Sequence, residues 1–464
     1  MDSDAGRWRD LARDGRLPRF ALLCLGIWLN AADSLVTSTI MPSVAADIGG
    51  YEFFAWPVAA YLLGAIVAGA SAGRLTEIVG LRAALFGAAL VYAGGCVAGA
   101  LAPGMAAFLA GRLLQGAGAG WIVGLVYGAV NAGFPKALWT RVLAAVSGVW
   151  GVATLLGPLL GGLFAEAGLW RMLFWLFASQ AVAFAGATLL LVPRTRARDL
   201  PRKLPLARLV LLSLAVLLIG TAGIADRLVA AIAMIVAGLA LLLLFVRLDK
   251  HASVSLMPPQ LGDPASISGA GYLMMFLANV SSVGFVIYGA ALLQKIYGLS
   301  PLASGYAIAT EAMSWTVCAL MVAGAPVRRQ AFFIRLGASC ILAGIALLGV
   351  AMPSGHLAFV IACAILLGAG FGLCWSFSIR RIFESLSDSE RALGSSAVPA
   401  VQIVGGAVGA AIAGTIANLL GMTHGMDAAG ALRIATWLFV ALIPVAFLAW
   451  LSALRFSAPS RGDV

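Results

Sequence analysis

Charged residues are scarce in this 464-residue sequence. Asp, Glu, Lys and Arg together make up 11% of it, against 62% hydrophobic residues. A water-soluble protein of this length needs far more charge to cover its surface, so the composition excludes a soluble globular protein and indicates lipid as the natural solvent. The 55 glycines fit this interpretation, because small residues allow membrane helices to pack closely.

Residues that hold metals or form disulfide bonds are also few. The six cysteines all fall inside apolar runs without C-x-x-C spacing, and the three histidines lie far apart in the sequence. We therefore expect neither disulfide bonds nor a metal site. The sequence contains no Walker-type phosphate loop, which argues against ATP as the energy source. We also expect no cofactor.

The net charge of +11 does not indicate nucleic-acid binding, because the basic residues lie in short segments between apolar runs and form no stripe on a soluble domain. Fourteen apolar stretches are long enough to cross a bilayer, since a spanning helix needs about 20 mostly apolar residues. We predict membrane-spanning helices at 20–42, 54–73, 83–101, 106–130, 142–165, 170–192, 206–224, 228–247, 268–293, 303–324, 331–351, 357–378, 396–419 and 431–454.

The distribution of Lys and Arg predicts the orientation. With the N-terminus inside, 25 of the 30 basic residues fall in inside segments, four fall in outside segments and Arg112 lies within a helix. Cytoplasmic loops carry such an excess of positive charge, so we expect both termini in the cytoplasm, an even number of spans and a multi-pass protein of the cell (inner) membrane. The charged N-terminal stretch is expected to be a cytoplasmic tail and not a signal peptide.

The predicted spans divide into six, two and six. Similar glycine clusters at 157–162 and 405–409, each in the fifth helix of its set, suggest an inverted internal repeat, which is the common plan of secondary transporters. We expect an all-α polytopic membrane protein with a cytoplasmic tail at 1–19, a six-helix bundle at 20–193, cytoplasmic linkers and an inserted helix pair at 194–267, a second six-helix bundle at 268–455 and a cytoplasmic tail at 456–464.

The segment after the second predicted span reads Gly73-Arg-Leu-Thr-Glu77-Ile-Val-Gly80-Leu-Arg82. It resembles the loop signature of the major facilitator superfamily, although that family usually has aspartate at the position of Glu77 and a basic residue at the position of Ile78. The resemblance implies a conformational role for Gly73, Glu77, Gly80 and Arg82. Gly80 would permit a tight turn, and Glu77 and Arg82 would contact the ends of neighbouring helices. The alternative is a solvated charged loop.

The fourth predicted span contains Arg112-Leu-Leu-Gln115-Gly-Ala-Gly-Ala-Gly120. This segment looks like the fourth-helix motif of the same family, whose arginine is linked to proton transfer. An arginine in lipid is costly and usually faces a polar interior. Arg112 is expected about 10 Å into its helix at about 1.5 Å per residue. The alternative is an arginine whose side chain reaches back to the membrane surface.

The first predicted span resembles a motif of the fourteen-helix drug–proton antiporters of this superfamily, in which an aspartate precedes a proline as Asp33 precedes Pro42. The expected depth of Asp33 matches that of Arg112, so we expect the two to pair or to make alternating contact. Apolar surroundings raise the pKa of an acid and a nearby arginine lowers it. An acid that alternates between these surroundings would therefore bind a proton in one conformation and release it in the other. The alternative is a static structural ion pair. One helix face, expected to line a cavity, holds Asn30, Asp33, Ser34, Thr37 and Met41.

The fifth predicted span contains Gly157-Pro158-Leu-Leu-Gly161-Gly162. It resembles the motif associated with antiporters of the superfamily, and this resemblance is what argues for export. Proline bends a helix and glycines allow close crossing, which suits a hinge or a tight interface against the other bundle.

Glu311 is the single deep acid of the second helix set, close to the expected midplane, with Trp315 one turn further on. Transporters hold substrate at this depth, and an acid beside an aromatic ring suits a lipophilic cation. The alternative is a protonated acid bonded to a neighbour. Further polar or aromatic candidates for the substrate cavity, residue types that pack against neighbours more often than they contact substrate, are Tyr61, Gln115, Trp150, Asn279, Tyr288, Trp375 and Gln402.

Three functions remain open at this level. The first is a proton-coupled exporter of small lipophilic or drug-like compounds, with Asp33, Arg112 and Glu311 in proton coupling. The second is proton-linked uptake of a small solute. The third, from another class, is a membrane protein that senses without transporting; an enzyme is not expected, because no cluster of reactive side chains is present. We expect small-molecule substrates, protons and the lipid bilayer as partners, no nucleic acid, and a monomer.

Overall fold

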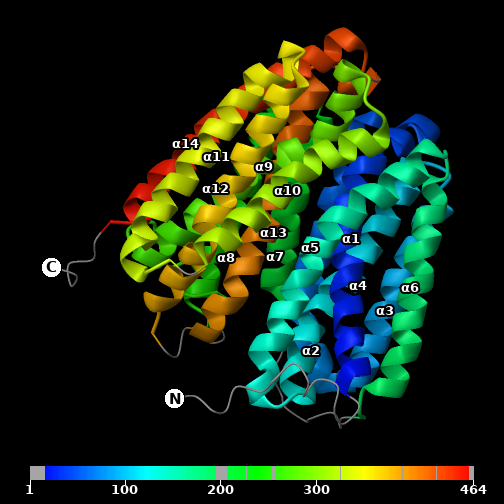
Figure 1. The fold of residues 1–464 in the computed structure, drawn as a ribbon, viewed down its shortest axis with the longest axis vertical. Helices are drawn as coiled ribbons and strands as arrows, with labels where there is room; N and C mark the ends of the chain where they lie inside the picture. Colours follow the sequence, from blue (N-terminus) through cyan, green and yellow to red (C-terminus); the bar gives the residue numbers. More distant parts are fainter. Residues whose placement is uncertain are drawn as a thin grey trace. The chain divides into compact units, whose positions relative to one another are not determined.

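The structure, a computed structural model, describes residues 16–194, 206–225, 227–252, 257–323, 325–387, 391–424 and 426–458 (Figure 1). Within these ranges the chain forms fourteen α-helices, as predicted. Their bounds are α1 Arg16–Ile48, α2 Trp56–Val79, α3 Leu81–Ala100, α4 Met105–Gly133, α5 Lys136–Glu166, α6 Trp170–Leu191, α7 Leu206–Thr221, α8 Leu228–Lys250, α9 Ile267–Tyr297, α10 Pro301–Val322, α11 Gln330–Ala351, α12 Leu357–Glu384, α13 Arg391–Leu419 and α14 Ala428–Phe456.

Several helices extend beyond the predicted spans, because a helix continues past the hydrocarbon layer wherever its backbone hydrogen bonds remain satisfied. Helix α1 passes through Pro42, where the predicted span stops, and ends at Ile48. Proline removes one backbone hydrogen bond, and membrane helices tolerate that loss when neighbouring groups compensate. Thirteen helices in the described part of the chain are long and apolar enough to cross a membrane; in α2 the apolar stretch that the structure describes is Trp56–Gly69.

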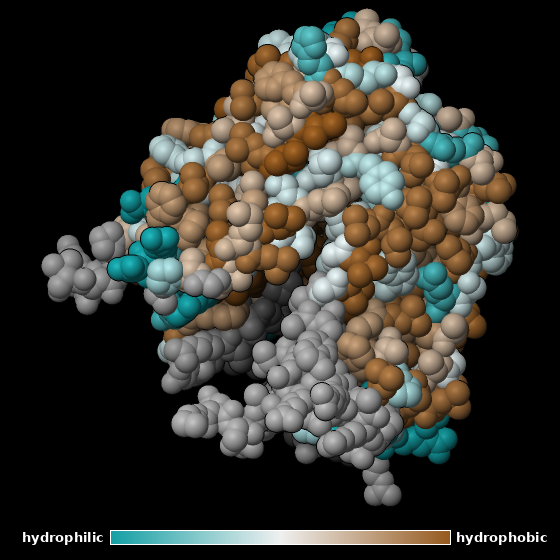
Figure 2. All heavy atoms as spheres, in the orientation of Figure 1, coloured by the Kyte–Doolittle hydropathy of each residue, from teal (hydrophilic) through white to brown (hydrophobic). Residues whose placement is uncertain are grey.

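Apolar residues cover much of the coloured part of the face shown in Figure 2. Helix α8 is the clearest case, with Val229 79% exposed and Leu243 62% exposed. Water would not tolerate so much exposed hydrocarbon, whereas lipid tails can cover it. The chain is therefore a multi-pass membrane protein.

The chain divides into two compact units. Unit 1 comprises Met1–Gly49 and Ala60–Pro205, and unit 2 comprises Gly50–Ala59 and Leu206–Val464. The first turn of α2 thus packs with unit 2, although the sequence places it inside the first bundle. In unit 1, α1 packs against α4, α5 and α6, and α3 packs against α4 and α6.

The inserted helices α7 and α8 belong to unit 2, where they pack against each other and α7 also packs against α13. A buried carboxylate fastens this pair. Asp249, near the end of α8, is 1% exposed and pairs with Arg208 at the start of α7. Its other oxygen accepts a hydrogen bond from the backbone N–H of Met257, at 2.8 Å, so the same residue also holds the chain that leads to α9.

Glycines of α4 bring three helices of unit 1 into close contact. A Cβ added at Gly116 would collide with the Tyr61 carbonyl of α2, and one added at Gly118 would lie 2.6 Å from Cα of Tyr92 in α3. The alternating glycines after Arg112 therefore act as packing residues, and they set the distance between the backbones that carry Tyr61, Tyr92 and Gln115.

We expect Gly116→Ala to destabilise the fold measurably. The added methyl group has no room against the Tyr61 carbonyl, and overpacking of this kind costs about 1–3 kcal/mol. Thermal unfolding followed by size-exclusion chromatography in detergent should show a lower midpoint. The matched control is Gly87→Ala in α3, where a Cβ has nothing within 4 Å. An equal midpoint for both variants would contradict this account of the α4 glycines.

Candidate functional site

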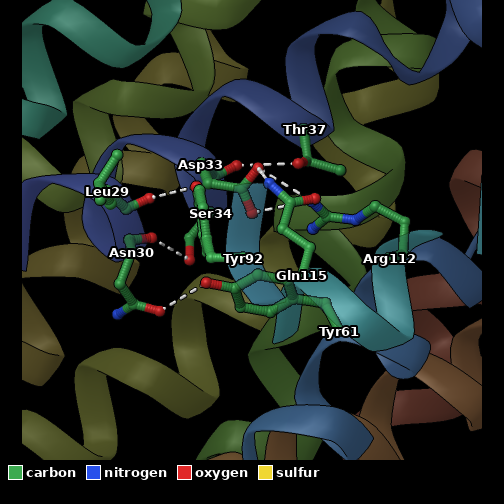
Figure 3. Close-up of polar contacts among 9 residues, drawn as sticks. All are labelled: Leu29, Asn30, Asp33, Ser34, Thr37, Tyr61, Tyr92, Arg112 and Gln115. Carbon is green, nitrogen blue, oxygen red and sulfur yellow. Dashed lines mark hydrogen bonds and ion pairs between the residues drawn. The ribbon is translucent and has the colours of Figure 1, made fainter. Parts of the chain in front are cut away.

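A closed polar network lies inside unit 1, between α1 and α4 (Figure 3). Asp33 and Arg112 are each 1% exposed, and Gln115 is fully buried. Nη1 of Arg112 donates to both carboxylate oxygens of Asp33, at 2.8 Å each, and to Oε1 of Gln115 at 2.7 Å. The amide nitrogen of Gln115 donates to Oδ1 of Asp33 at 3.0 Å. Each of these three side chains therefore contacts the other two.

Two tyrosines complete the surroundings of the ion pair. The guanidinium carbon of Arg112 lies 4.5 Å from the ring centroid of Tyr61, a cation–π contact. The Tyr61 hydroxyl donates to Oδ1 of Asn30 at 2.7 Å, which links the ring back to α1. The Tyr92 hydroxyl donates to the Leu29 carbonyl at 2.9 Å. Sequence reasoning missed Tyr92, because a single tyrosine in an apolar run carries no signal of its own.

The structure thus brings together Asp33, Arg112, Gln115, Tyr61 and Asn30 from three helices. Both charges are compensated and hydrogen-bonded, which is the condition under which an ion pair persists away from water. The predicted pairing of Asp33 with Arg112 is present. Its role in proton transfer stays a prediction.

The other predicted cavity residues of α1 bond to their own helix. The Ser34 hydroxyl donates to the Asn30 carbonyl at 2.9 Å, and the Thr37 hydroxyl donates to the Asp33 carbonyl at 2.8 Å. Thr37 and Met41 are buried. In this structure that part of the predicted cavity face packs within unit 1.

An acid without a partner lies in unit 2. Glu311 of α10 is 7% exposed and has no hydrogen-bond or ion-pair partner within the part of the chain that the structure describes. A Cβ added at Gly368 of α12 would collide with the Glu311 carbonyl, so α10 and α12 pack in backbone contact there. A lone carboxylate in such surroundings is costly unless a proton or a cation accompanies it.

An aromatic cluster follows Glu311 on the same pair of helices. Trp315 stacks on Phe371 with ring centroids 4.8 Å apart, and its centroid lies 5.5 Å from that of Trp375. Trp375 is buried and Trp315 is half-buried. Trp315, one turn after Glu311, therefore belongs to one compact aromatic group with Trp375, to which the structure adds Phe371.

The remaining cavity candidates have separate surroundings. Trp150 of α5 is exposed. Asn279 of α9 is half-buried and donates to the Met275 carbonyl of its own helix. Tyr288 of α9 is fully buried and stacks on Phe54. Gln402 of α13 is half-buried.

The predicted conformational motifs have clear structural roles where they are described. Gly80 adopts φ 80° between Val79 of α2 and Leu81 of α3, which confirms the predicted tight turn. Arg82 is half-buried. Gly73 lies within α2, and its surroundings and the side chain of Glu77 are outside the described part of the structure, so the predicted contacts of Glu77 stay a prediction.

Helix α5 crosses α1 through its glycines. A Cβ at Gly157 would lie 2.8 Å from the Leu35 Cβ, and one at Gly161 would lie 3.1 Å from the Thr39 Cβ. Pro158 lies inside α5, and the helix continues through it and through Gly162 to Glu166. The motif forms a tight interface as expected, but the interface described is with α1 of the same unit.

Comparison with known proteins adds a family match. The sequence model described as Major Facilitator Superfamily matches residues 23–376. A Mycobacterium tuberculosis protein named probable multidrug-efflux transporter is 32% identical over 437 residues, covering 90% of each chain. The cephamycin export protein of Amycolatopsis lactamdurans is 30% identical and covers 85% of this chain and 84% of its own. The crystal structure of a D-xylose–proton symporter shares the fold, with a TM-score of 0.67 and 16% identity, covering 97% of this chain and 99% of that one.

Proposed function

We propose that this chain, which belongs to the Major Facilitator Superfamily, is a secondary active transporter that exports small lipophilic or drug-like compounds in exchange for protons. The observation that carries the proposal is the Asp33–Arg112–Gln115 network, an ion pair enclosed within a membrane bundle. Ionisable side chains in such places mark ion pathways and proton relays. The names of the two relatives, a multidrug-efflux transporter and a cephamycin export protein, support transport out of the cell.

Asp33 is proposed as the proton carrier of unit 1. When a proton binds its carboxylate, the contact with Arg112 loses its ionic part. Gln115 and the Tyr61 ring still face the guanidinium, so the positive charge keeps favourable neighbours while the pair opens. When the proton leaves, the three-residue network closes again. Proton binding and opening of the pair are then linked steps, as an antiporter requires.

Glu311 is proposed as the group that binds cationic substrate in unit 2. Its buried carboxylate needs a positive partner, and the aromatic ring of Trp315 on the same helix offers a further contact to a lipophilic cation. A proton and a cation would compete for the same carboxylate. Because only one of them can occupy the carboxylate, binding of the proton would release the cation, and binding of the cation would release the proton.

The finer assignments belong to the same proposal. We place the protein among the fourteen-helix drug–proton antiporters, with α7 and α8 inserted between two six-helix sets that are related as repeats. Both sets begin on the cytoplasmic side in the proposed orientation, so neither is inverted relative to the other. The excess of Lys and Arg in the alternate segments supports cytoplasmic termini and the inner membrane. We propose that the protein works as a monomer without a cofactor or nucleic acid.

Everted membrane vesicles test the direction of transport. Vesicles containing the protein and an imposed proton gradient should accumulate a fluorescent lipophilic cation such as ethidium, and adding the cation should release protons from the vesicle lumen. Vesicles that carry Arg112→Gln serve as the inactive control, because that variant removes the charge that faces Asp33. Accumulation of the cation by intact cells in a manner that requires Asp33 would instead establish uptake.

A further inference from the structure

The connection from α1 to α2 and the first turn of α2 pack with unit 2. Two consecutive glycines with positive φ, Gly49 at 70° and Gly50 at 78°, end α1 and begin this connection. The boundary between the two units falls between them, so residues 50–59 group with unit 2 while the chain on both sides belongs to unit 1. We call residues 50–59 the strap. Only glycine adopts two successive left-handed conformations without strain, which makes this pair a natural hinge.

Apolar contacts fix the strap on α9 and α13. Phe54 is 1% exposed and stacks on the fully buried Tyr288 of α9, with ring centroids 5.3 Å apart. Ala55 is also buried, and a Cβ added at Gly414 of α13 would lie 3.2 Å from the Cβ of Ala55. The strap therefore packs against α13 at a glycine, Gly414, which has no side chain to keep the two backbones apart.

Helix α7 and the turn that follows it supply the other side of this surface. The Trp56 ring lies against Gly220 of α7, where an added Cβ would be 3.6 Å from it. Asn418 of α13 joins the two sides, because its amide nitrogen donates both to the Glu52 carbonyl of the strap and to the Gly223 carbonyl that follows α7. One side chain thus holds the strap, α13 and the end of α7 together.

The fit of the strap is incomplete. A small cavity of about 10 Å³, close to the volume that one water molecule needs, remains beside the strap and is lined by Glu52, Trp56, Gly220, Gly223, Gly414 and Asn418 together with alanines. Oδ1 of Asn418 and the hydroxyl of Tyr288 are buried without a hydrogen-bond partner in the described chain. Water would satisfy both atoms once the strap lifted, which offsets part of the hydrogen bonding lost on release. Hydration of these two atoms would therefore lower the cost of lifting the strap, as a reversible closure requires.

We propose that the strap is a gate segment that docks on α7, α9 and α13 to close one side of the transporter and lifts from them once in each transport cycle, with Asn418 as its latch. The inserted helix α7 and the turn after it then have a function of their own, which is to form part of the docking surface through Gly220 and Gly223. This inference rests on the proposed transport function for the cycle, but the docking itself can be measured without a substrate.

A disulfide bond across the docking contact tests the proposal. In a protein whose six native cysteines are replaced by serine, Ala55→Cys with Gly414→Cys should cross-link under copper–phenanthroline, because the two Cβ positions at 3.2 Å are near the usual disulfide spacing of about 3.8 Å. Transport should fall to background when the bond forms and recover with dithiothreitol. The matched control is Gly284→Cys with Ala413→Cys, which joins α9 to α13 at a Cβ separation of 3.6 Å and should leave transport intact.

The latch is tested by the rate of cross-linking in detergent without substrate. Asn418→Ala should slow cross-linking of the Ala55→Cys, Gly414→Cys protein about tenfold, the expected effect of losing two hydrogen bonds, and should speed maleimide labelling of Ala55→Cys alone. Thr415→Ala, one turn away, removes a hydroxyl that bonds only its own helix and should change neither rate.

Undiminished transport by the cross-linked protein, or equal cross-linking rates with and without Asn418→Ala, would overturn the proposal. A cysteine-free parent that transports nothing would count against the proposed function, while these rates would still decide whether the strap docks through Asn418.

Discussion

Asp33→Asn should abolish proton-coupled transport while the protein still inserts into the membrane. The substitution keeps a hydrogen-bond acceptor of the same size for Arg112 but removes the site that binds and releases a proton. It also removes the negative charge that faces a buried guanidinium, and breaking a buried pair in this way costs about 3–5 kcal/mol. We therefore expect transport at background level in everted vesicles, together with a lower thermal midpoint of the purified protein.

Two further variants separate loss of coupling from loss of stability. Asp33→Asn combined with Arg112→Gln removes both charges, so stability should recover towards that of the parent while transport stays at background. Asp47→Asn makes the same substitution in the same helix, at a carboxylate that is 48% exposed in its pair with Arg171. Exposed pairs of this kind contribute about 0–1 kcal/mol, so this control should transport normally. Proton-coupled transport by Asp33→Asn at the parent rate would remove Asp33 from the mechanism.

Glu311→Gln should weaken transport of cationic substrates selectively. The amide has the shape of the acid but no charge, so the ionic contact with a cation is lost while the Trp315 cluster stays in place. Losing a desolvated charge contact costs about 2–5 kcal/mol, which corresponds to a rise in KM of about thirtyfold or more. KM measured for a lipophilic cation and for a neutral analogue of similar shape would show the difference.

The matched control for Glu311 is Glu384→Gln at the end of α12. Glu384 is 48% exposed and pairs with Arg380, so its loss should leave both KM values unchanged. An equal loss of transport for cationic and neutral substrates with Glu311→Gln would assign this acid to proton coupling and not to substrate binding. Unchanged KM values for cations would contradict the proposed site.

Much of the architecture was predictable because lipid imposes simple rules on a chain. Every backbone polar group must be satisfied inside the membrane, so each long apolar run becomes a helix. All fourteen predicted helices are present. Their ends were less predictable, as α1 and α5 show: α1 continues past Pro42, and α5 begins at Lys136 before its apolar run. Hydropathy identifies the residues that lie in the hydrocarbon layer, whereas the residue at which a helix begins or ends depends on its local backbone hydrogen bonds.

The candidate site was predictable in its members and less so in its contacts. The depths of Asp33 and Arg112 along their helices indicated that they could meet. The position of Gln115 between them could not be predicted, because it depends on how α4 is rotated towards α1. Gln115 was expected to face a cavity, and in the structure it is fully buried and bonded to both charges. Tyr92 and Phe371 had no sequence signal at all.

The sequence by itself determined that this is a fourteen-helix membrane protein, and it predicted three ionisable side chains deep in the membrane, Asp33, Arg112 and Glu311. Only the tertiary structure decided that two of these neutralise each other while the third has no partner in the described chain, and that residues 50–59 pack with unit 2. The physical reason is that hydrophobicity and charge are properties of single residues, so their pattern can be read directly from the sequence. Pairing depends on helix rotation and on which glycines allow two backbones to approach, and these are settled only when the helices pack.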